Sequence, residues 1–452
     1  MRRFWSDEKG SMIVMFAVAL IPVLALMGAA IDYSRANLAR TKMQGALDAT
    51  ALFLSKLPAG STQEDLTAKG TVYFFANYTE SDVLSIQLSF TPAETPGKLN
   101  LTAVGTYNPV MVNIAGVTSF PVGTKTEVKW GNSRLRVALV LDVTGSMSSD
   151  GKMTAMKTAT KNLLTMLKNA ATTNGDVYVS IIPFNRDVAV ATTNYTADWV
   201  RWDLWDAANG TCNKTGYTTQ SNCVAQKVCT LPSYTSQGSC QTNGGSWVSA
   251  TWTPANHNTW NGCITDRDKD PVGTADYDTK NTAPTILTPS TLFPAHQYSS
   301  CPAQMMGLSY DWIALNQKVD DLSPVGSTNQ GIGLQWGWQS LTSAPFTIPA
   351  FDANYVYKHV IILLSDGENT QNRWSTSTSA IDAREALTCT NVKATGVVLC
   401  TVQVNTGGDP LSTVLQNCAT DSGKFFQLTS ASQMITTFDQ IGTELSDLHL
   451  SQ

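Results

Sequence analysis

Hydrophobic side chains first gather in one uninterrupted run, from Met12 to Ile31. No charged residue occurs between Lys9 and Asp32. At about 1.5 Å per residue, a helix over this run reaches about 30 Å, the thickness of the hydrocarbon core of a membrane. The run therefore predicts a transmembrane helix over 12–31. A cleaved secretory signal is the alternative, because residues 28–30 (Gly-Ala-Ala) are the small residues typical of a cleavage site.

The pattern then changes twice before residue 132. Residues 33–56 are rich in alanine, leucine, arginine and lysine, which favours continuation of the helix into the aqueous phase. Between residues 84 and 129, three segments alternate apolar and polar side chains, and a turn over 92–97 separates the first two. We therefore expect an N-terminal segment over 1–59 and a small α+β region with an antiparallel sheet over 60–131.

From residue 132 to residue 452, short apolar runs alternate with helical periodicity. The runs VALVL and VIILLS are continuous, as in strands that are buried on both faces. Such alternation predicts an α/β fold, with a Rossmann-like parallel sheet covered by helices on both faces. Residues 192–308 lack the pattern and are expected to form an insertion. The expected strands are 137–141, 176–183, 397–404 and 424–428, with a further strand that ends at residue 366, and the expected helices are 152–171, 379–393, 411–419 and 431–448.

The N-terminal segment resembles a known family. The stretch KGSMIVMFAVALIPVLALMGAAIDYSRANLARTKMQGALDATAL, and above all its GAAIDYSRA junction, is similar to the N-terminal segment of TadG-type proteins of Flp/Tad pilus assembly. The resemblance implies a bacterial protein that is anchored in the cell membrane and associated with pilus assembly.

Oxygen-bearing side chains follow two of the predicted buried strands. The first strand ends in DVTGS at 142–146, which places one carboxylate and two hydroxyls in a short loop before a helix. The second strand ends at Asp366, and Thr328 lies in a glycine-flanked loop before another helix. The carboxyl ends of the strands form the ligand-binding edge of an open α/β sheet. Oxygen ligands in such a place suit a hard divalent cation.

These five positions resemble the metal-ion-dependent adhesion site (MIDAS) of von Willebrand factor A (VWA) domains. The resemblance implies direct contact with the ion from Thr144, Ser146 and Thr328. It also implies contact, directly or through water, from Asp142 and Asp366. Each residue alone could be a helix cap or a turn former, but five in the expected order favour a metal site. A VWA domain over 132–452 is thus expected, with Mg2+ as the cofactor and Ca2+ or Mn2+ as alternatives.

Composition and motifs argue against several other functions. The chain has 30 Lys+Arg against 35 Asp+Glu, so no basic excess exists to bind nucleic acid. Its four histidines do not show HExxH spacing, and the chain has neither a GxSxG elbow nor a GxxxxGK[ST] loop. A DxDxT phosphohydrolase would need a second carboxylate where Thr144 stands. We therefore expect a protein that is not an enzyme.

Cysteines indicate an oxidising compartment. Six of the nine lie in the insertion, and two segments there share the pattern Cys-x4-Tyr-Thr-x-Gln-x2-Cys. Four cysteines permit three pairings, and two loops closed within the repeats are the simplest. Cys400 lies in an apolar run and is expected to be a buried free thiol. Disulfides place the chain after the membrane helix outside the cytoplasm. The expected pairs are Cys212–Cys223, Cys229–Cys240, Cys263–Cys301 and Cys389–Cys418.

The insertion also holds six of the twelve tryptophans and a run of charges. The tryptophans could form a platform for a partner or glycan, but a small core of the insertion itself is favoured because aromatic residues dominate core energetics. The charged residues 266–270 begin like a calcium loop, yet Pro271 and Tyr277 replace the required glycine and glutamate. They are expected to be solvated. The six tryptophans are Trp199, Trp202, Trp205, Trp247, Trp252 and Trp260.

Two functional hypotheses follow. The first is a single-pass protein of the bacterial cell membrane, with a cytoplasmic N-terminus and a periplasmic or extracellular bulk. It would bind a protein partner that offers an acidic residue to the metal, such as a pilus-assembly component or a surface ligand. The second is a spacer or scaffold of the pilus or secretion apparatus, with a metal-stabilised domain and no ligand of its own.

Overall fold

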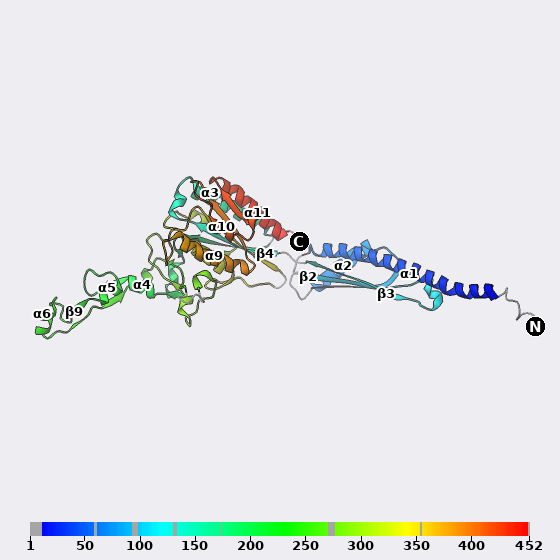
Figure 1. Ribbon diagram of the computed structural model, residues 1–452, viewed down its shortest axis with the longest axis horizontal. Coiled ribbons are helices and arrows are strands. Elements are labelled where there is room, and N and C mark those ends of the chain that lie inside the picture. The colour runs from blue at the N-terminus through cyan, green and yellow to red at the C-terminus, as the bar shows by residue number, and fades with distance from the viewer. Residues whose placement is uncertain are drawn as a thin grey trace, which may run out of the picture. The chain divides into compact units, whose positions relative to one another are not determined.

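The computed structural model describes residues 11–57, 61–92, 98–129, 133–171, 173–269, 276–352 and 355–450 (Figure 1). The chain divides into two compact units. The first is built from the N-terminal part up to Ser133, and the second begins at Arg134.

The first unit packs two helices on a small antiparallel sheet with the strand order β1-β2-β3. The second half of α1 buries one stripe of apolar side chains against this sheet, including Ala39, Met43 and Leu47. The expected long helix and antiparallel sheet are both present. The elements are α1 (Ser11–Leu54), α2 (Gln63–Asn77), β1 (Val83–Pro92), β2 (Lys98–Tyr107), the 3-10 helix η1 (Val112–Ala115) and β3 (Phe120–Lys129).

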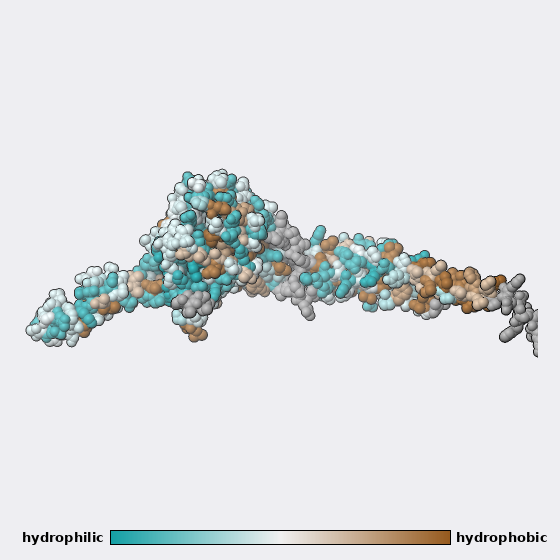
Figure 2. Space-filling view, in the orientation of Figure 1, coloured by the Kyte–Doolittle hydropathy of each residue, from teal (hydrophilic) through white to brown (hydrophobic). Residues whose placement is uncertain are grey.

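The first half of α1 has a different environment. Residues 12–27 are exposed, and Met12, Ile21 and Leu26 each leave between 68% and 75% of their surface open. Figure 2 shows this end of the helix as a brown, apolar surface. Among the described residues, α1 is one helix whose length and hydropathy suffice to cross a membrane.

The second unit is built around an eight-stranded sheet with the order β12-β6-β5-β4-β15-β16-β17, and β14 pairs with β5. The pairs β4–β5, β15–β16 and β16–β17 are parallel. The sheet is nevertheless mixed rather than wholly parallel, because β6, β12 and β14 run antiparallel to their neighbours. The strands are β4 (Ser133–Asp142), β5 (Val177–Phe184), β6 (Val188–Ala189), β12 (Cys263–Ile264), β14 (Met306–Ser309), β15 (Val356–Ser365), β16 (Val398–Val404) and β17 (Phe425–Leu428).

Helices cover both faces of this sheet. Side chains of α3, α7 and α11 share one apolar core with Leu139 and Leu141 of β4. Those of α8, α9 and α10 share the other core with Ala138 and Val140. The alternation of β4 side chains between the two cores is the geometry of a strand buried on both sides. The helices are α3 (Lys152–Ala170), α7 (Trp312–Asp320), α8 (Gln330–Thr342), α9 (Thr378–Ala394), α10 (Thr413–Cys418) and α11 (Gln433–Leu450).

Residues 192–308 form short elements, some of which join the main unit. Strand β12 extends the main sheet, so part of this stretch is continuous with it. Trp205 and Trp260 belong to the core under α8, whereas Trp252 forms a small cluster with Cys223. The remaining elements are η2 (Gly145–Ser148), η3 (Thr192–Thr196), β7 (Val200–Arg201), α4 (Asp203–Ala208), β8 (Gly210–Cys212), α5 (Gln220–Val224), β9 (Lys227–Cys229), α6 (Gln237–Thr242), β10 (Trp247–Ser249), β11 (Trp252–Pro254), η4 (His257–Thr259), η5 (Tyr277–Thr279), η6 (Pro289–Thr291), β13 (Phe293–Pro294) and η7 (Ser422–Lys424).

Candidate metal-binding site

Asp142 is the last residue of β4, and its side chain is fully buried. Its Oδ1 accepts a hydrogen bond from the backbone N–H of Thr144 at 2.8 Å. Its Oδ2 accepts one from the hydroxyl of Ser365 at 2.5 Å. Ser365 ends β15, the neighbour of β4 in the sheet. Asp142 therefore ties together the carboxyl ends of two adjacent strands, and Ser365 is a member of the site that the sequence motif did not reveal.

Three further residues of the motif continue this cluster. The hydroxyls of Thr144 and Ser146 lie 2.9 Å apart, and Ser146 donates a hydrogen bond to Oδ1 of Asp366 at 2.7 Å. Thr144 and Asp366 are buried, whereas Ser146 is exposed. The structure thus brings Asp142, Thr144, Ser146 and Asp366 together at one edge of the sheet, with Ser146 on the solvent side.

Thr328 lies in the loop before α8, and this loop is bonded to the loop after β4. The N–H of Val325 donates to the carbonyl of Val143 at 2.7 Å, and the N–H of Gly145 donates to that of Gly326 at 3.0 Å. Gly326 has a φ of 84°, and a Cβ built there would lie 2.6 Å from the side-chain nitrogen of Asn185. Only glycine fits this position without strain.

Thr328 differs from the other four residues because its hydrogen bonds are made by the backbone. Its backbone N–H donates to the hydroxyl of Thr370 at 2.8 Å, and its carbonyl accepts from the N–H groups of Thr370 and Gln371. Thr328 is 4% exposed. Among the hydrogen bonds of the described residues, none joins its hydroxyl to the Asp142 cluster. The loop is therefore adjacent to the cluster, while a role for the hydroxyl stays a prediction.

The cluster carries two buried carboxylates and one buried ammonium. Burial, together with the charge of Asp366, raises the pKa of Asp142 well above that of a solvated aspartate. The ammonium of Lys152, the first residue of α3, lies 2.5 Å from Oδ2 of Asp366. Lys152 balances the charge of Asp366, so the charge that Asp142 carries when it is ionised remains for a cation to balance.

These residues fit a hard divalent cation. Carboxylate and hydroxyl oxygens are the ligands that Mg2+, Ca2+ and Mn2+ prefer. Asp142, Thr144, Ser146 and Asp366 are the side chains that could hold the ion, and the exposed Ser146 leaves the cluster open to solvent. The arrangement can bind a cation and keep one side of it accessible.

The insertion reaches the Thr328 loop through Asp266. Both oxygens of this carboxylate accept hydrogen bonds from Asn329, at 3.0 and 3.1 Å, and Oδ2 also accepts the N–H of Arg373 at 3.0 Å. Burial raises the pKa of Asp266 to about 6. The expectation of a solvated charge run was wrong here: Asp266 and Arg267 are buried because each finds hydrogen-bond partners inside the unit.

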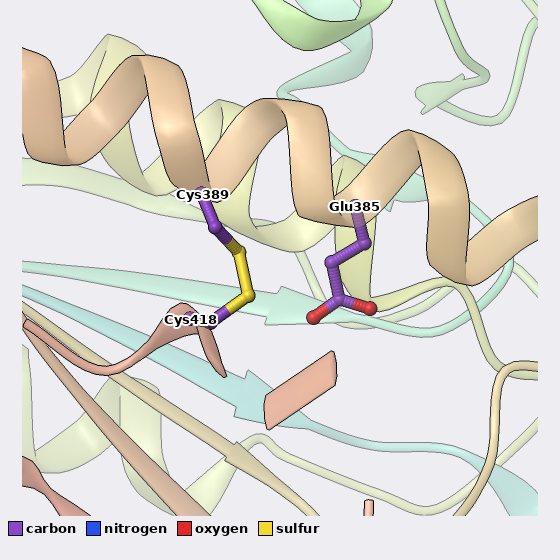
Figure 3. Close-up of side chains that lie close together, drawn as sticks. All are labelled: Glu385, Cys389 and Cys418. Carbon is purple, nitrogen blue, oxygen red and sulfur yellow. A yellow bond between two sulfur atoms is a disulfide. The ribbon is translucent and has the colours of Figure 1, made fainter. Parts of the chain in front are cut away.

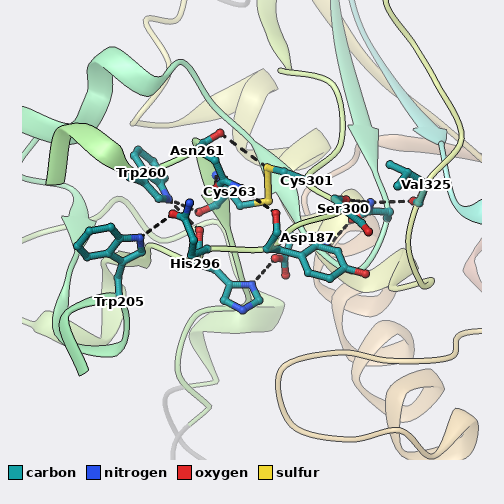
Figure 4. Close-up of a disulfide and its surroundings, with 12 residues drawn as sticks. Asp187, Trp205, Trp260, Asn261, Cys263, His296, Ser300, Cys301 and Val325 are labelled. Atoms are coloured by element: carbon teal, nitrogen blue, oxygen red, sulfur yellow. Dashed lines mark hydrogen bonds and ion pairs between the residues drawn. A yellow bond between two sulfur atoms is a disulfide. The ribbon is translucent and has the colours of Figure 1, made fainter. Parts of the chain in front are cut away.

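A disulfide fixes the same part of the insertion to the sheet (Figure 4). Cys263 of β12 is bonded to Cys301. Nearby, Nδ1 of His296 lies 2.5 Å from the carboxylate of Asp187. Asn185, which follows β5, donates to the carbonyls of Ser300 and Val325 at 2.7 and 2.8 Å. Asn185 therefore joins the insertion to the loop that carries Thr328.

The structure contains four disulfides, which are the four expected pairs, and Cys400 is a buried free thiol. One of them adjoins a buried carboxyl group, as Figure 3 shows: Glu385 lies beside Cys389–Cys418. The two sulfurs are bonded to each other, so this trio is not available to a metal ion. Burial raises the pKa of Glu385 to about 8, and Asn369 donates to its Oε2 at 2.7 Å.

The solved structures that are similar to this chain include pilus and byssus proteins. A pilus adhesin, SpaC from Lactobacillus rhamnosus GG, has 14% identity and a TM-score of 0.36, and the match covers 81% of this chain and 35% of that one. Proximal thread matrix protein 1 from the mussel byssus, with a zinc-occupied MIDAS motif, has 14% identity, a TM-score of 0.32, and coverage of 70% and 46%. The vWF domain of the type V pili tip protein Mfa5 from Porphyromonas gingivalis has 10% identity, a TM-score of 0.35, and coverage of 70% and 95%.

These likenesses are too low in TM-score to assign the fold, and the chain spans about a third of the SpaC structure and under half of the byssus protein. No curated protein matches the sequence. A family model does match the N-terminal segment: residues 10–53 fit the family described as putative Flp pilus-assembly TadE/G-like. The segment that includes the apolar half of α1 is therefore TadE/G-like, as its sequence indicated.

Proposed function

We propose that this chain is a membrane-anchored, extracytoplasmic binding protein associated with Tad/Flp pilus assembly or surface attachment. In this proposal, residues 132–452 form a VWA domain that carries an insertion at 192–308 and binds a partner through a divalent cation. One observation carries the proposal: Asp142, Thr144, Ser146 and Asp366 meet in one hydrogen-bonded cluster at the edge of the sheet.

The chemistry of the cluster supports binding rather than a reaction. A bound Mg2+ would supply a coordination position that a carboxylate of a partner protein can take. The protein's own residues do the positioning. Asp142 is fixed by two hydrogen bonds, Asp366 is held by Ser146 and Lys152, and Ser146 faces solvent. We expect Mg2+ to be the resident ion, with Ca2+ or Mn2+ as alternatives, and we expect no enzymatic activity.

The location follows from the anchor and the disulfides. An apolar, exposed first half of α1 supports a single span over 12–31. Four disulfides in the second unit support an oxidising compartment for the bulk of the chain. Together they favour a cytoplasmic N-terminus and a periplasmic or extracellular second unit.

A capture experiment tests the binding function. The full-length chain, held in detergent, is used to isolate partners from bacterial envelopes with Mg2+ or with a chelator. The proposal predicts a partner that is retained with Mg2+ and lost with the chelator or in the Asp142→Ala variant. Asp150→Asn, at an exposed aspartate of the same loop, is the matched control and should retain the partner. Equal retention under all four conditions would refute metal-dependent binding.

A second function is favoured by one observation. Lys152 already provides Asp366 with a cationic partner, so the cluster has a source of positive charge within the chain. A spacer or scaffold of the pilus or secretion apparatus, with no ligand of its own, would need nothing more than a stable unit. Saturable Mg2+ binding without any chelator-sensitive partner would favour this scaffold.

A further inference from the structure

The loop between β2 and β3 is unusually apolar for an exposed connection. Residues 108–119, which join the two strands, contain no charged side chain. Three of its large apolar side chains are open to solvent: Val110 is 59% exposed, Met111 45% and Val117 44%. Exposed apolar side chains that gather in one loop can form a contact surface for a partner or a membrane.

This loop is fastened to α1 at the end of its apolar run. The carboxylate of Asp32 accepts hydrogen bonds from the N–H groups of three successive residues, Val110 at 3.1 Å, Met111 at 2.7 Å and Val112 at 2.7 Å. Asp32 itself is only 1% exposed. The bonds satisfy three backbone donors that would otherwise need water.

Met111 also packs on the helix one turn further toward the N-terminus. A Cβ built on Gly28 would lie 2.9 Å from Cβ of Met111, so the absence of a side chain at Gly28 allows this close approach. Gly28 belongs to the uncharged run of residues 12–31. Figure 1 shows the cyan loop lying beside the blue helix at this point. The exposed apolar side chains are thus at the level of the last turn of the expected span.

We propose that the β2–β3 loop inserts into the membrane interface beside α1 and gives the first unit a second, non-spanning contact with lipid. The inference rests on the proposed membrane anchor. Backbone N–H groups in an apolar environment need partners, and Asp32 supplies them for the inserted residues. Binding at the membrane interface grows with the apolar area that is buried there, and a loop without charged side chains can enter without desolvating a charge. A span alone can tilt and rotate, whereas a span with an attached loop fixes the orientation of the unit on the membrane.

A second protein is the alternative to lipid as the partner of this loop. Lipid is favoured because the loop touches α1 within the run that itself would lie in the membrane, so any partner there would also have to enter the bilayer. The lipid contact of the loop is continuous with that of the helix.

Spin labels on the full-length chain in liposomes test the proposal. Cysteine is introduced singly at Val110, at Ile21 in the middle of the span and at Val72 on α2, which is 73% exposed. Tyr73, next to Val72, stacks on Phe53, far along α1 from Asp32. Collision with oxygen reports lipid exposure, and collision with a water-soluble nickel chelate reports water. We expect the labels at 110 and 21 to favour oxygen and the label at 72 to favour nickel.

The outcomes distinguish a failure of the loop proposal from a failure of the proposed membrane anchor. A label at 110 that behaves like the label at 72, while 21 favours oxygen, would overturn the loop insertion and leave the anchor intact. A label at 110 that is shielded from both reagents would show a protein partner and would also overturn it. A nickel-accessible label at 21 would overturn the anchor itself. In the Asp32→Ala variant, which loses three acceptor bonds, we expect the label at 110 to become more mobile and less accessible to oxygen.

Discussion

The ammonium group of Lys152 lies 2.5 Å from Oδ2 of Asp366, and both side chains are almost completely buried. Lys152 begins the helix that follows the Asp142 loop, so its position is set by the backbone of the same motif. Asp366 thus has one tethered cation as a partner. A divalent ion that binds the cluster must share Asp366 with this ammonium or displace it.

Replacing Lys152 by methionine should strengthen Mg2+ binding. The substitution keeps most of the apolar volume and removes a positive charge next to the ion, so we expect an increase in affinity of about tenfold or more, which corresponds to about 1.4 kcal/mol. Isothermal titration of the full-length chain measures it. Lys157→Met on the same helix is the control, because Lys157 is bonded to Asp320 instead. Equal affinities in the two variants would show that Lys152 does not oppose the ion.

Glu385 should make the second unit less stable as pH rises. Burial raises its pKa to about 8, whereas the unfolded chain has the ordinary value of 4.5. The folded state therefore holds the proton more tightly, and its stabilising contribution is complete below pH 4.5 and is lost as pH rises toward 8. We expect Tm to fall less between about pH 5 and about pH 8.5 in Glu385→Gln than in the natural sequence. Glu368→Gln, at an exposed position, should leave the slope unchanged. An unaltered slope in Glu385→Gln would refute this assignment.

The Cys389–Cys418 disulfide should stabilise the second unit strongly. It joins α9 to α10 across 29 residues of sequence and lies in the core beneath α8. Loop-closure entropy predicts that replacing both cysteines with serine costs about 3 to 4 kcal/mol. Chemical denaturation followed by tryptophan fluorescence measures the change. The Cys229–Cys240 pair lies outside the two sheet cores, so its removal should leave the main transition in place. An equal effect of the two removals would contradict this difference.

Close packing of α8 on the sheet should depend on Gly337. A Cβ at this position would lie 2.4 Å from a methyl carbon of Val140 on β4. Gly337→Ala should therefore destabilise the unit by about 1 to 3 kcal/mol, because the helix must shift away from the strand. Gly331→Ala in the same helix is a matched control, since its Cβ would have no neighbour closer than 3.5 Å. A Gly337→Ala variant as stable as Gly331→Ala would show that the contact relaxes without cost.

Regular elements could be predicted from the sequence because their signals are local. Continuous apolar runs ending at Asp142 and Asp366 marked two buried strands, and the helical periodicity of 152–171 matched α3. The short antiparallel strands β6, β12 and β14 could not be predicted, because two to four residues carry too little pattern. Their pairing depends on tertiary contacts of the insertion.

Some residues of the site could not be predicted from the sequence either. The strand ends and the VWA resemblance pointed to Asp142, Thr144, Ser146 and Asp366, which the fold brings together. Lys152 and Ser365 lie near motif residues in the sequence, but their contacts with Asp366 and Asp142 depend on the tertiary fold. Asp266 and Arg267 were misjudged because a charged run is usually solvated, whereas Asp266 is paired with Asn329 inside the unit; Lys269 is exposed as expected, and residue 270 lies outside the described residues.

Magnesium titration of the full-length chain shows whether the Asp142 cluster binds a metal ion. Isothermal titration is performed on the natural sequence, on Asp142→Ala and Asp366→Ala, and on the control Asp150→Asn. We expect saturable binding of one ion per chain for the natural sequence and for Asp150→Asn, and loss of binding in the other two variants. Binding that survives in both Asp142→Ala and Asp366→Ala, or that is absent from the natural chain, would contradict it.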